Sequence, residues 1–275
     1  MSTIYDSFDF GFDPTVPDDL KPKDVAPTAL PAQASVDSQY LPPVGKQTMP
    51  NCFVWASTYG LATVWAAQAG EYSPTSPSQQ AAPDYTYIQV EEATGIVSGA
   101  CVGGKMASVF SFLSSNGGTA ALSAAQNQTT CSDNWNAYGP GTTPIAADAS
   151  FAVPGVGVTS ISNGTQGLNN MRTIIASGVP LAYGTRLYTD FPPYDGTPSP
   201  YVGNGVILKN KTTGKDAGHC MMIIGYDDAY NGGDGAVLIQ NSFGASWGSS
   251  GFVWMAYATF QALAQGSGAY VTSSS

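Results

Sequence analysis

Residues 52–70 read CFVWASTYGLATVWAAQAG, a segment whose apolar side chains cover nearly every side of a helix. A helix of this kind is buried at the centre of a domain, because it has no polar face to turn toward water. Asn51 stands where an N-cap belongs, and Gly70 ends the pattern. We therefore expect a central helix from 52 to 70, around which the rest of the chain packs.

The remaining pattern divides the chain into a helical front part and a back part rich in strands. Further helices are predicted at 104–113 and 168–178, where the periodicity returns. After Gly178, short apolar runs alternate with Gly, Pro and Asn, which is typical of strands. These runs are 180–188, 201–210, 219–228, 235–242 and 251–257. The order indicates an α+β protein with two packed subdomains.

The composition excludes several classes of function. The 275 residues contain 9 Lys and Arg against 19 Asp and Glu, a net charge of −10, which would repel nucleic acid and anionic membranes. No apolar run is long enough to cross a membrane. The single histidine, His219, cannot build a zinc site that needs several, and the four cysteines are too widely spaced for a Cys-x-x-Cys motif. We expect no metal, no organic cofactor, and no nucleic-acid or membrane partner.

Cys52 occupies a position that can activate a thiol. It opens the central helix, where unpaired backbone N–H groups and the helix dipole stabilise a thiolate. Taken alone, Cys52 also fits a buried, inert thiol, and His219 fits an ordinary core residue before an apolar run. Neighbouring segments have to distinguish these interpretations.

Three segments carry the residue types of a thiol-dependent active site, in a fixed order. They are GKQTMPNCFVWAS (45–57), KDAGHCMMIIGYDD (215–228) and VLIQNSFGASWGSSGFVWM (237–255). This series resembles the papain-like cysteine peptidases, in which Gln and Cys are followed by His before an apolar strand and then by Asn-Ser-Trp-Gly. SVDSQYLPPVGKQ (35–47) and CVGGK (101–105) are similar to two further family segments. The resemblance covers about residues 31–260, and five segments in the family's order are far more specific than any one of them.

The resemblance implies roles for four residues. Cys52 would be the nucleophile and His219 its imidazole partner, together forming a thiolate–imidazolium pair. Asn241 would orient the imidazole. Gln47 would donate its side-chain amide to the oxyanion, with the backbone N–H of Cys52 as second donor. Taken alone, Gln47 also fits a surface residue and Asn241 a turn residue.

The family pattern also implies which residues surround the substrate. Phe243 and Trp247 would shield the hydrogen bond between His219 and Asn241 from water. Glycines in CVGGK would let a substrate backbone approach closely, because no Cβ stands in the way. The expected substrate-binding residues are Gly103, Gly104, Met106, Ala182, Gly184, Ala217, Gly218 and Trp247. Small residues in this set suggest a pocket for apolar or aromatic side chains.

The chain departs from the family pattern around the nucleophile and after the asparagine. Gln47 is one residue closer to Cys52 than is usual, and Met49 replaces a cysteine that often precedes the nucleophile. Phe53 and Phe243 replace two tryptophans, which keeps an aromatic ring and loses the indole N–H. The shielding role needs only the ring and is therefore expected to remain.

The expected fold is α+β and papain-like. An acidic, extended N-terminal arm, 1–30, precedes the peptidase domain, 31–275. In that domain a helical subdomain, 48–150, faces a β-barrel-like subdomain, 151–260, with the active-site cleft between them. Residues 261–275 are expected to form a C-terminal tail.

The other three cysteines receive different assignments. Cys101 and Cys131 resemble two disulfide cysteines of the family whose usual partners are missing here, and we predict that they pair with each other. Cys220 follows His219 on an apolar run and is expected to be a buried structural thiol. A disulfide implies an oxidising compartment, so a secreted protein, or one in the periplasm or a lysosome-like lumen, is expected.

The activity implied by the resemblance is endopeptidase hydrolysis of polypeptides through a thioester acyl-enzyme, by a chain expected to be a monomer. Two other functions stay open. Amines also resolve thioesters, which would make the protein an acyl transferase of transglutaminase type, and the fold also suits a non-catalytic binding protein. In a further alternative, the arm of residues 1–30 covers the cleft as a remnant of an inhibitory pro-segment, or a protein inhibitor does so.

Overall fold

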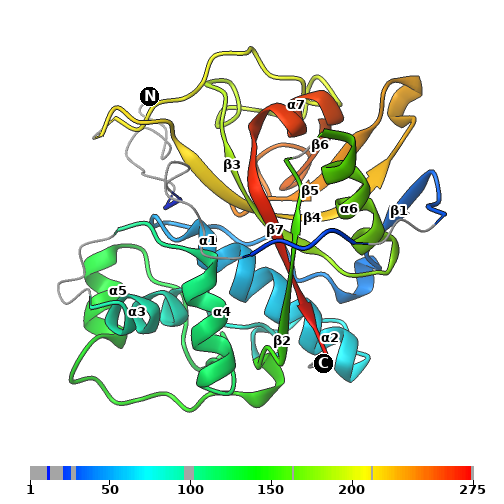
Figure 1. Ribbon diagram of the computed structural model, residues 1–275. Coiled ribbons are helices and arrows are strands. Elements are labelled where there is room, and N and C mark those ends of the chain that lie inside the picture. The colour runs from blue at the N-terminus through cyan, green and yellow to red at the C-terminus, as the bar shows by residue number, and fades with distance from the viewer. Residues whose placement is uncertain are drawn as a thin grey trace.

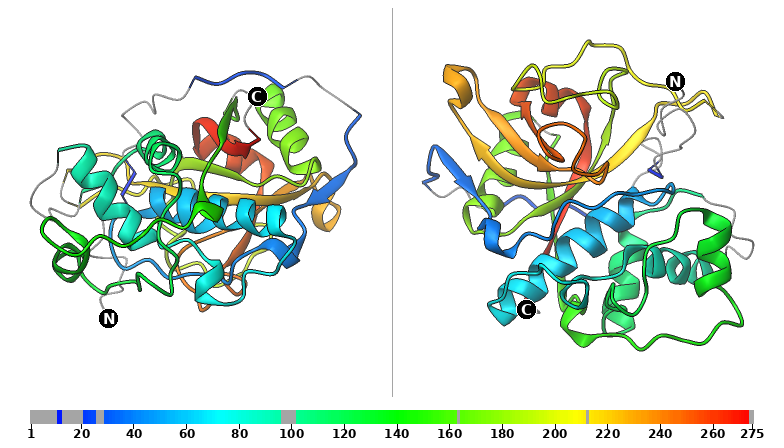
Figure 2. Two further views of the ribbon diagram at one scale, coloured as in Figure 1. Left: turned by 90° about the horizontal axis from the view of Figure 1, so that it is seen from below. Right: turned by 180° about the vertical axis from the view of Figure 1, so that it is seen from behind.

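The computed structural model describes residues 11–12, 21–25, 29–95, 102–162, 164–211 and 213–273. The molecule has two parts that lie side by side, one made mainly of helices and the other built on a β-sheet (Figure 1). Views from below and from behind show the same division (Figure 2). The predicted α+β class is confirmed.

The predicted central helix runs from 52 to 70. It begins as α1 (Cys52–Val54), continues through the π-helix η3 (Trp55–Ala62) and ends as α2 (Thr63–Gly70). Every side chain of η3 is buried, as the all-round apolar pattern predicts. The helix lies between the other helices and the sheet, and it therefore belongs to the cores of both parts.

The rest of the helical part packs around this helix. It consists of α3 (Pro83–Ala93), α4 (Met106–Ser115) and α5 (Cys131–Tyr138), with the short 3-10 turns η2 (Ser38–Tyr40), η4 (Pro77–Gln79) and η5 (Ala149–Phe151). The helix expected at 104–113 corresponds to α4. The sequence pattern did not indicate α3, which begins with Pro83 in its first turn and buries aromatic and polar side chains together.

The sheet is antiparallel, with strands in the order β2-β7-β3-β4-β5-β6 and β1 paired with β4 outside this path. Its strands are β1 (Gln33–Ser35), β2 (Gly155–Ser160), β3 (Leu181–Arg186), β4 (Gly218–Asp227), β5 (Ala236–Gln240), β6 (Phe252–Ala256) and β7 (Ala264–Thr272). The expected β-barrel-like subdomain is in fact an open sheet, since β2 and β6 end the path and do not pair with each other. Closing a barrel would require that pairing.

Two segments differ from their predicted structure. Residues 264–272, inside the expected C-terminal tail, form β7, which pairs with β2 and β3. The expected strand at 201–210 makes only isolated bridges, in which Tyr201 pairs with Met255, Ile207 with Tyr188 and Lys209 with Asp216. Gly203 and Gly205 in this segment have φ values of +72° and +77°, which an extended strand cannot contain.

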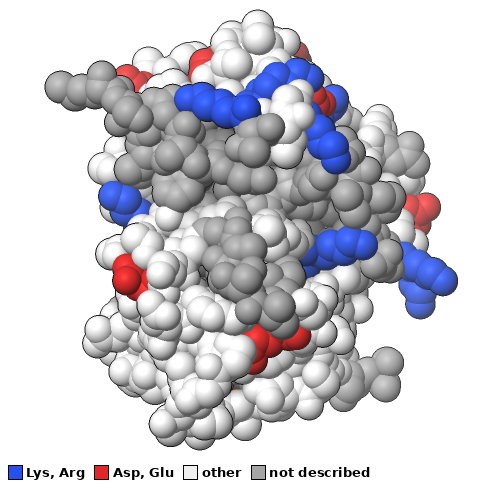
Figure 3. All heavy atoms as spheres, turned by 90° about the vertical axis from the view of Figure 1, so that its left-hand side faces the viewer, with Lys and Arg blue, Asp and Glu red and all other residues white. Residues whose placement is uncertain are grey.

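Two further helices, α6 (Gly164–Ala176) and α7 (Tyr257–Leu263), pack against the sheet. The first of them corresponds to the helix expected at 168–178. The turn η6 (Tyr230–Gly232) lies between β4 and β5. On the face shown in Figure 3, most of the described atoms belong to uncharged residues, in keeping with a chain that is only 10% charged. Among the described residues, no helix is both long and apolar enough to span a bilayer.

Candidate active site

Cys52 is the first residue of α1 and is completely buried. Asn51 occupies the N-cap position, as predicted, but its side chain makes no capping hydrogen bond. Its Nδ2 group instead donates to Oδ1 of Asp84 over 2.9 Å. The N-terminus of the long central helix therefore acts on Cys52, where its partial positive charge favours a thiolate.

His219 and Asn241 come from neighbouring strands of the sheet. His219 is the second residue of β4, and Asn241 directly follows β5, so the antiparallel pairing of these strands brings the two side chains together. Nε2 of His219 and Oδ1 of Asn241 are 2.7 Å apart, and Oδ1 also accepts from the backbone N–H of Ser242 at 2.8 Å. A carbonyl oxygen only accepts, so Nε2 carries the hydrogen and Nδ1 is the ring nitrogen left for Cys52.

The thiol of Cys52 is strongly influenced by its neighbours. Burial raises its pKa, but hydrogen bonds to Cys220 and His219, together with the positive charge of the His219 ring, outweigh burial and lower the pKa to about 6. At neutral pH the side chain is then mainly thiolate, which is the nucleophilic form. The geometry thus supplies an activated sulfur beside an imidazole that Asn241 holds in one orientation.

Aromatic rings cover the imidazole. Phe243 stacks on His219 with ring centroids 4.6 Å apart and planes inclined by 25°. Trp247 meets Phe243 edge to face at 5.6 Å and donates its indole N–H to the carbonyl oxygens of Phe191 and Pro192. Phe243 and Trp247 are buried, as are His219 and Asn241, so the hydrogen bond between His219 and Asn241 lies away from water.

Gln47 lies beside this site and is held from both ends of its amide. Its Nε2 donates to the backbone oxygen of Met49 over 3.0 Å, and its Oε1 accepts from the hydroxyl of Ser242. The backbone N–H of Gln47 donates to the carbonyl of Ser242 at 2.8 Å. Ser242 follows Asn241, so one short segment positions both side chains.

Residue 11 of the N-terminal arm lies against the expected substrate glycines. The backbone N–H of Gly104 donates to the carbonyl oxygen of Gly11 over 2.9 Å. A Cβ placed on Gly103 would come within 2.5 Å of the same oxygen, so only glycine allows the backbones to approach this closely. The pair of glycines therefore lies in close contact with the backbone of residue 11.

The next residue, Phe12, contacts the sheet part of the molecule. It forms an antiparallel bridge with Gly218, directly before His219, and is buried. A Cβ on Gly184 would lie 2.3 Å from the Phe12 ring, so the absence of a side chain there makes room for the aromatic group. Ala182 lies two residues earlier on β3 and hence on the same face as Gly184.

The remaining expected pocket residues are part of the core: Met106 begins α4, Ala217 precedes β4, and both are buried. The structure adds three neighbours of the site that were not among the expected site residues, namely Asp84, Ser242 and the arm residues 11–12. The Asn-Ser pair was a signal for Ser242, and the alternative in which the arm covers the cleft concerned residues 11–12, whereas Asp84 comes from a helix that was not predicted. Among the described residues, no group of three His, Cys, Asp or Glu side chains could hold a metal ion.

Comparisons with known proteins bear on the family and the fold of the chain. A model of the papain family of cysteine proteases matches residues 38–269. The chain shares its fold with xylellain, a cysteine protease from Xylella fastidiosa, with a TM-score of 0.65 and 19% identity over 94% of both chains. It is also similar to digestive procathepsin L 3 of Tenebrio molitor larval midgut, with a TM-score of 0.61 and 20% identity over 92% of this chain and 73% of that one.

A third similar structure is the proform of Amb a 11, a cysteine protease and ragweed pollen allergen, with a TM-score of 0.59 and 16% identity over 89% of this chain and 66% of that one. At these identities the structural likeness shows the fold alone. No curated protein sequence matches the chain. Because the family model spans most of its length, the chain belongs to the papain family of cysteine proteases.

Proposed function

We propose that this cysteine-type peptidase cleaves peptide bonds with Cys52 as nucleophile, His219 as general acid and base, and Asn241 as the residue that orients the imidazole. The observation that carries this proposal is the Cys52 thiol, hydrogen-bonded to a His219 ring whose Nε2 lies 2.7 Å from Asn241 Oδ1. This is the arrangement of an activated nucleophile, its base and an orienting group.

The reaction proceeds in two halves. The Cys52 thiolate attacks the carbonyl carbon of the scissile bond, and the electron pair of the C=O bond moves to oxygen. As the oxyanion collapses, His219 gives its Nδ1 proton to the leaving amine, and a thioester remains on Cys52. His219 then takes a proton from water, which attacks the thioester and releases the acid product.

Gln47 is proposed as a donor to the oxyanion, with the backbone N–H of Cys52. Its Nε2 carries two hydrogens, one of which donates to Met49, and the other is then available to a substrate oxygen. Ser242 supports the amide through Oε1. Holding such a donor in advance lowers the energy of the developing charge without reorganisation.

The substrate backbone is proposed to bind where residue 11 now lies, on Gly103 and Gly104. The ring of Phe12 marks the space for a substrate side chain next to Gly184 and Gly218. Because that space accommodates an aromatic ring, an aromatic or large apolar residue is the proposed preference of the pocket.

The N-terminal arm is proposed to compete with substrate for the groove that Gly103, Gly104, Gly184 and Gly218 would line. Its contacts continue away from the site: the backbone N–H of Lys23 donates to the carbonyl of Val158 on β2, and Asp24 accepts from the Asn170 side chain of α6. These contacts tie the arm to the sheet part while residues 11–12 occupy the groove. Displacing or cleaving the arm is then needed for full activity.

Secretion or a lumenal location, and the disulfide between Cys101 and Cys131, are proposed with this function. Cys131 begins α5, whereas Cys101 lies outside the described residues, so their pairing stays a prediction. An acidic, weakly charged chain that acts on polypeptides as a monomer fits an extracellular or lysosome-like setting.

The test compares the protein with its Cys52→Ala variant. Both are incubated with an epoxide that alkylates active-site thiols, and intact mass and turnover of a fluorogenic dipeptide amide are measured. An adduct and turnover in the parent, both absent from the variant, support the peptidase. Labelling at Cys52 with transfer to an added amine instead of water would favour an acyl transferase, and a parent that neither labels nor turns over would favour a binding protein.

A further inference from the structure

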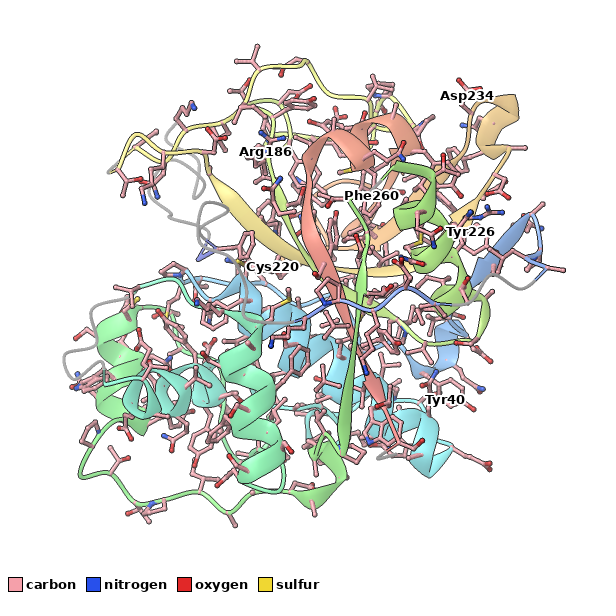
Figure 4. The ribbon with its side chains drawn as sticks, in the orientation of Figure 1. Tyr40, Arg186, Cys220, Tyr226, Asp234 and Phe260 are labelled. Carbon is pink, nitrogen blue, oxygen red and sulfur yellow. The ribbon has the colours of Figure 1, made fainter. Side chains whose placement is uncertain are left out.

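A second buried thiol lies beside Cys52. Cys220 follows His219 on β4, and both Cys52 and Cys220 carry thiols that are not in a disulfide bond. The two side chains are hydrogen-bonded to each other, and the backbone of Cys220 also hydrogen-bonds to the Cys52 thiol. Figure 4 shows Cys220 where β4 meets the central helix. The peptidase mechanism uses no thiol at this position.

The packing of β4 on the central helix creates this contact. Side chains two residues apart on a strand point to the same face, so Cys220 and Met222 both face the helix. They line one small cavity together with Ala56 and Gly60, which follow Cys52 along the helix. A Cβ on Gly60 would lie 3.0 Å from Sδ of Met222, so Met222 packs at the later turn and Cys220 at the turn that begins with Cys52.

We propose that Cys220 is a resolving thiol that forms a reversible disulfide with Cys52 after a peroxide has oxidised Cys52. This inference rests on the proposed function, because it needs Cys52 in its thiolate form. A low-pKa thiolate with a second thiol poised next to it is the arrangement of redox-sensitive cysteine pairs.

The chemistry has two steps and takes its oxidant from hydrogen peroxide. In the first step the Cys52 sulfur attacks one peroxide oxygen, an S–O bond forms, the O–O bond breaks and hydroxide leaves. Cys52 is oxidised to the sulfenic acid and the peroxide is reduced. In the second step the Cys220 sulfur attacks the Cys52 sulfur, the S–S bond forms, the S–O bond breaks, and hydroxide leaves with the Cys220 proton as water.

The disulfide would switch the peptidase off without destroying it. With its sulfur bonded to Cys220, Cys52 cannot attack a carbonyl. The same bond keeps Cys52 from further oxidation to the sulfinic acid, which thiols do not reverse. A dithiol reductant breaks the bond by thiol–disulfide exchange and restores both thiols. Because Cys220 is adjacent to His219, the switch is built into the strand that carries the base.

The experiment treats the reduced full-length protein with two equivalents of hydrogen peroxide, one for each oxidation step from thiol to sulfinic acid, and then follows three readouts. These are intact mass, disulfide-linked peptides after digestion, and turnover before and after dithiothreitol. For the parent we expect the loss of two hydrogens, a linked peptide pair containing Cys52 and Cys220, loss of turnover, and its recovery with dithiothreitol. A Cys52→Ala variant should form no such pair.

The Cys220→Ala variant is compared with its own untreated activity. After peroxide treatment it should gain two oxygens at Cys52. The turnover that dithiothreitol then restores should be at least about tenfold lower than the turnover restored in the parent. Cys220→Ser serves the same purpose if the alanine variant does not fold. The peptide map of the parent shows, without any variant, whether Cys52 and Cys220 are linked. The inference is overturned if Cys52 links to Cys101 or Cys131, if the parent gains oxygen as the Cys220→Ala variant does, or if both recover equally.

Failure of this inference and failure of the proposed function give different results. A parent that forms the Cys52–Cys220 disulfide but never turns over a peptide keeps the redox pair and loses the peptidase. A parent that turns over peptides but forms only the sulfinic acid keeps the peptidase and loses the redox pair.

Discussion

The side-chain amide of Asn51 donates to the buried carboxylate of Asp84 over 2.9 Å, directly before the residue that begins the central helix. The other oxygen of Asp84 accepts from the backbone N–H of Gln128 at 2.8 Å. Asp84 thereby joins α3, the loop at 128 and the start of α1. The backbone that carries Cys52 is therefore tied, through Asn51, to a buried carboxylate.

The first prediction concerns the pH dependence of stability. Burial raises the pKa of Asp84 from 3.8 to about 6, although hydrogen bonds from Gln128 and Asn51 oppose the shift. Between these pH values the folded state binds more protons than the unfolded chain. The free energy of unfolding therefore falls as pH rises through this window, by about 3 kcal/mol for this group.

Asp84→Asn keeps the size of the side chain and removes its titration. In the Cys52→Ala background, which prevents self-digestion, urea unfolding between pH 4 and pH 7 should show a flatter curve for Asp84→Asn than for the parent. Asp234→Asn, at an exposed carboxylate, should follow the parent. Parallel curves for the parent and Asp84→Asn would contradict this assignment.

The second prediction concerns the reactivity of the Cys52 thiol. With a thiol pKa of about 6, alkylation of Cys52 by iodoacetamide should reach half its maximal rate near that pH. In His219→Ala the hydrogen bond and the charge of the ring are both lost, so the midpoint should rise toward the ordinary thiol value of about 8.5. Mass-mapped alkylation rates measure this, with Asn241→Ala, which keeps the imidazole, as control. A midpoint that stays in place without His219 would refute the thiolate–imidazolium pair.

The third prediction concerns Gln47. Removing an oxyanion donor typically costs about 10²–10³ in rate, so Gln47→Ala should lower kcat by that factor while KM changes little. Ser242→Ala should cause a smaller loss, because it frees the amide without removing it. Gln39→Ala, at an exposed glutamine, is the control. Equal rates for the parent and Gln47→Ala would mean that another group stabilises the oxyanion.

The fourth prediction concerns the N-terminal arm. Burying a phenylalanine ring contributes about 1.5–3 kcal/mol, so Phe12→Ala should weaken occupation of the groove by about 10–100-fold. An arm that competes with substrate raises the apparent KM, and the variant should therefore show a lower KM with unchanged kcat. Steady-state kinetics with a dipeptide amide measure both constants. Val206→Ala, at an exposed side chain, should leave KM unchanged, and an unchanged KM in Phe12→Ala would exclude competition by this residue.

The fifth prediction concerns the specificity pocket. Gly184→Ala places a methyl group where it would lie 2.3 Å from the ring of Phe12, so it should disfavour aromatic substrate side chains. The ratio of kcat/KM for a phenylalanine substrate over an alanine substrate should fall by about tenfold or more. Gly233→Ala, at an exposed glycine with room for a Cβ, is the matched control. A ratio that does not change would place the pocket elsewhere.

The local elements with strong patterns were predictable from the sequence. The central helix from 52 to 70 could be predicted because its apolar periodicity is a property of consecutive residues. The order of the segments around Gln47, Cys52, His219 and Asn241 indicated the family without any coordinates. By contrast, α3 was not predicted, because its burial comes from packing against α4 and α5 and leaves no clear amphipathic pattern.

The sheet shows where sequence patterns stop being informative. The strands β3 to β6 were recognisable as apolar runs, but pairing with β2 and β3 is what makes residues 264–272 a strand and not a tail. Whether the sheet closes or stays open depends on which edges meet, and edge contacts join residues far apart in the chain.

The sequence by itself determined the family, the chemical types of the candidate site residues and the helix that begins at Cys52, because these depend on residue identity and short-range spacing. Only the tertiary structure decided that Asp84 holds Asn51, that residues 11–12 lie against Gly104 and Gly218, and that the Cys220 thiol touches Cys52. Each of these contacts joins segments that are distant along the chain. Their distances are set when the sheet and the helices pack together, and no local pattern encodes that packing.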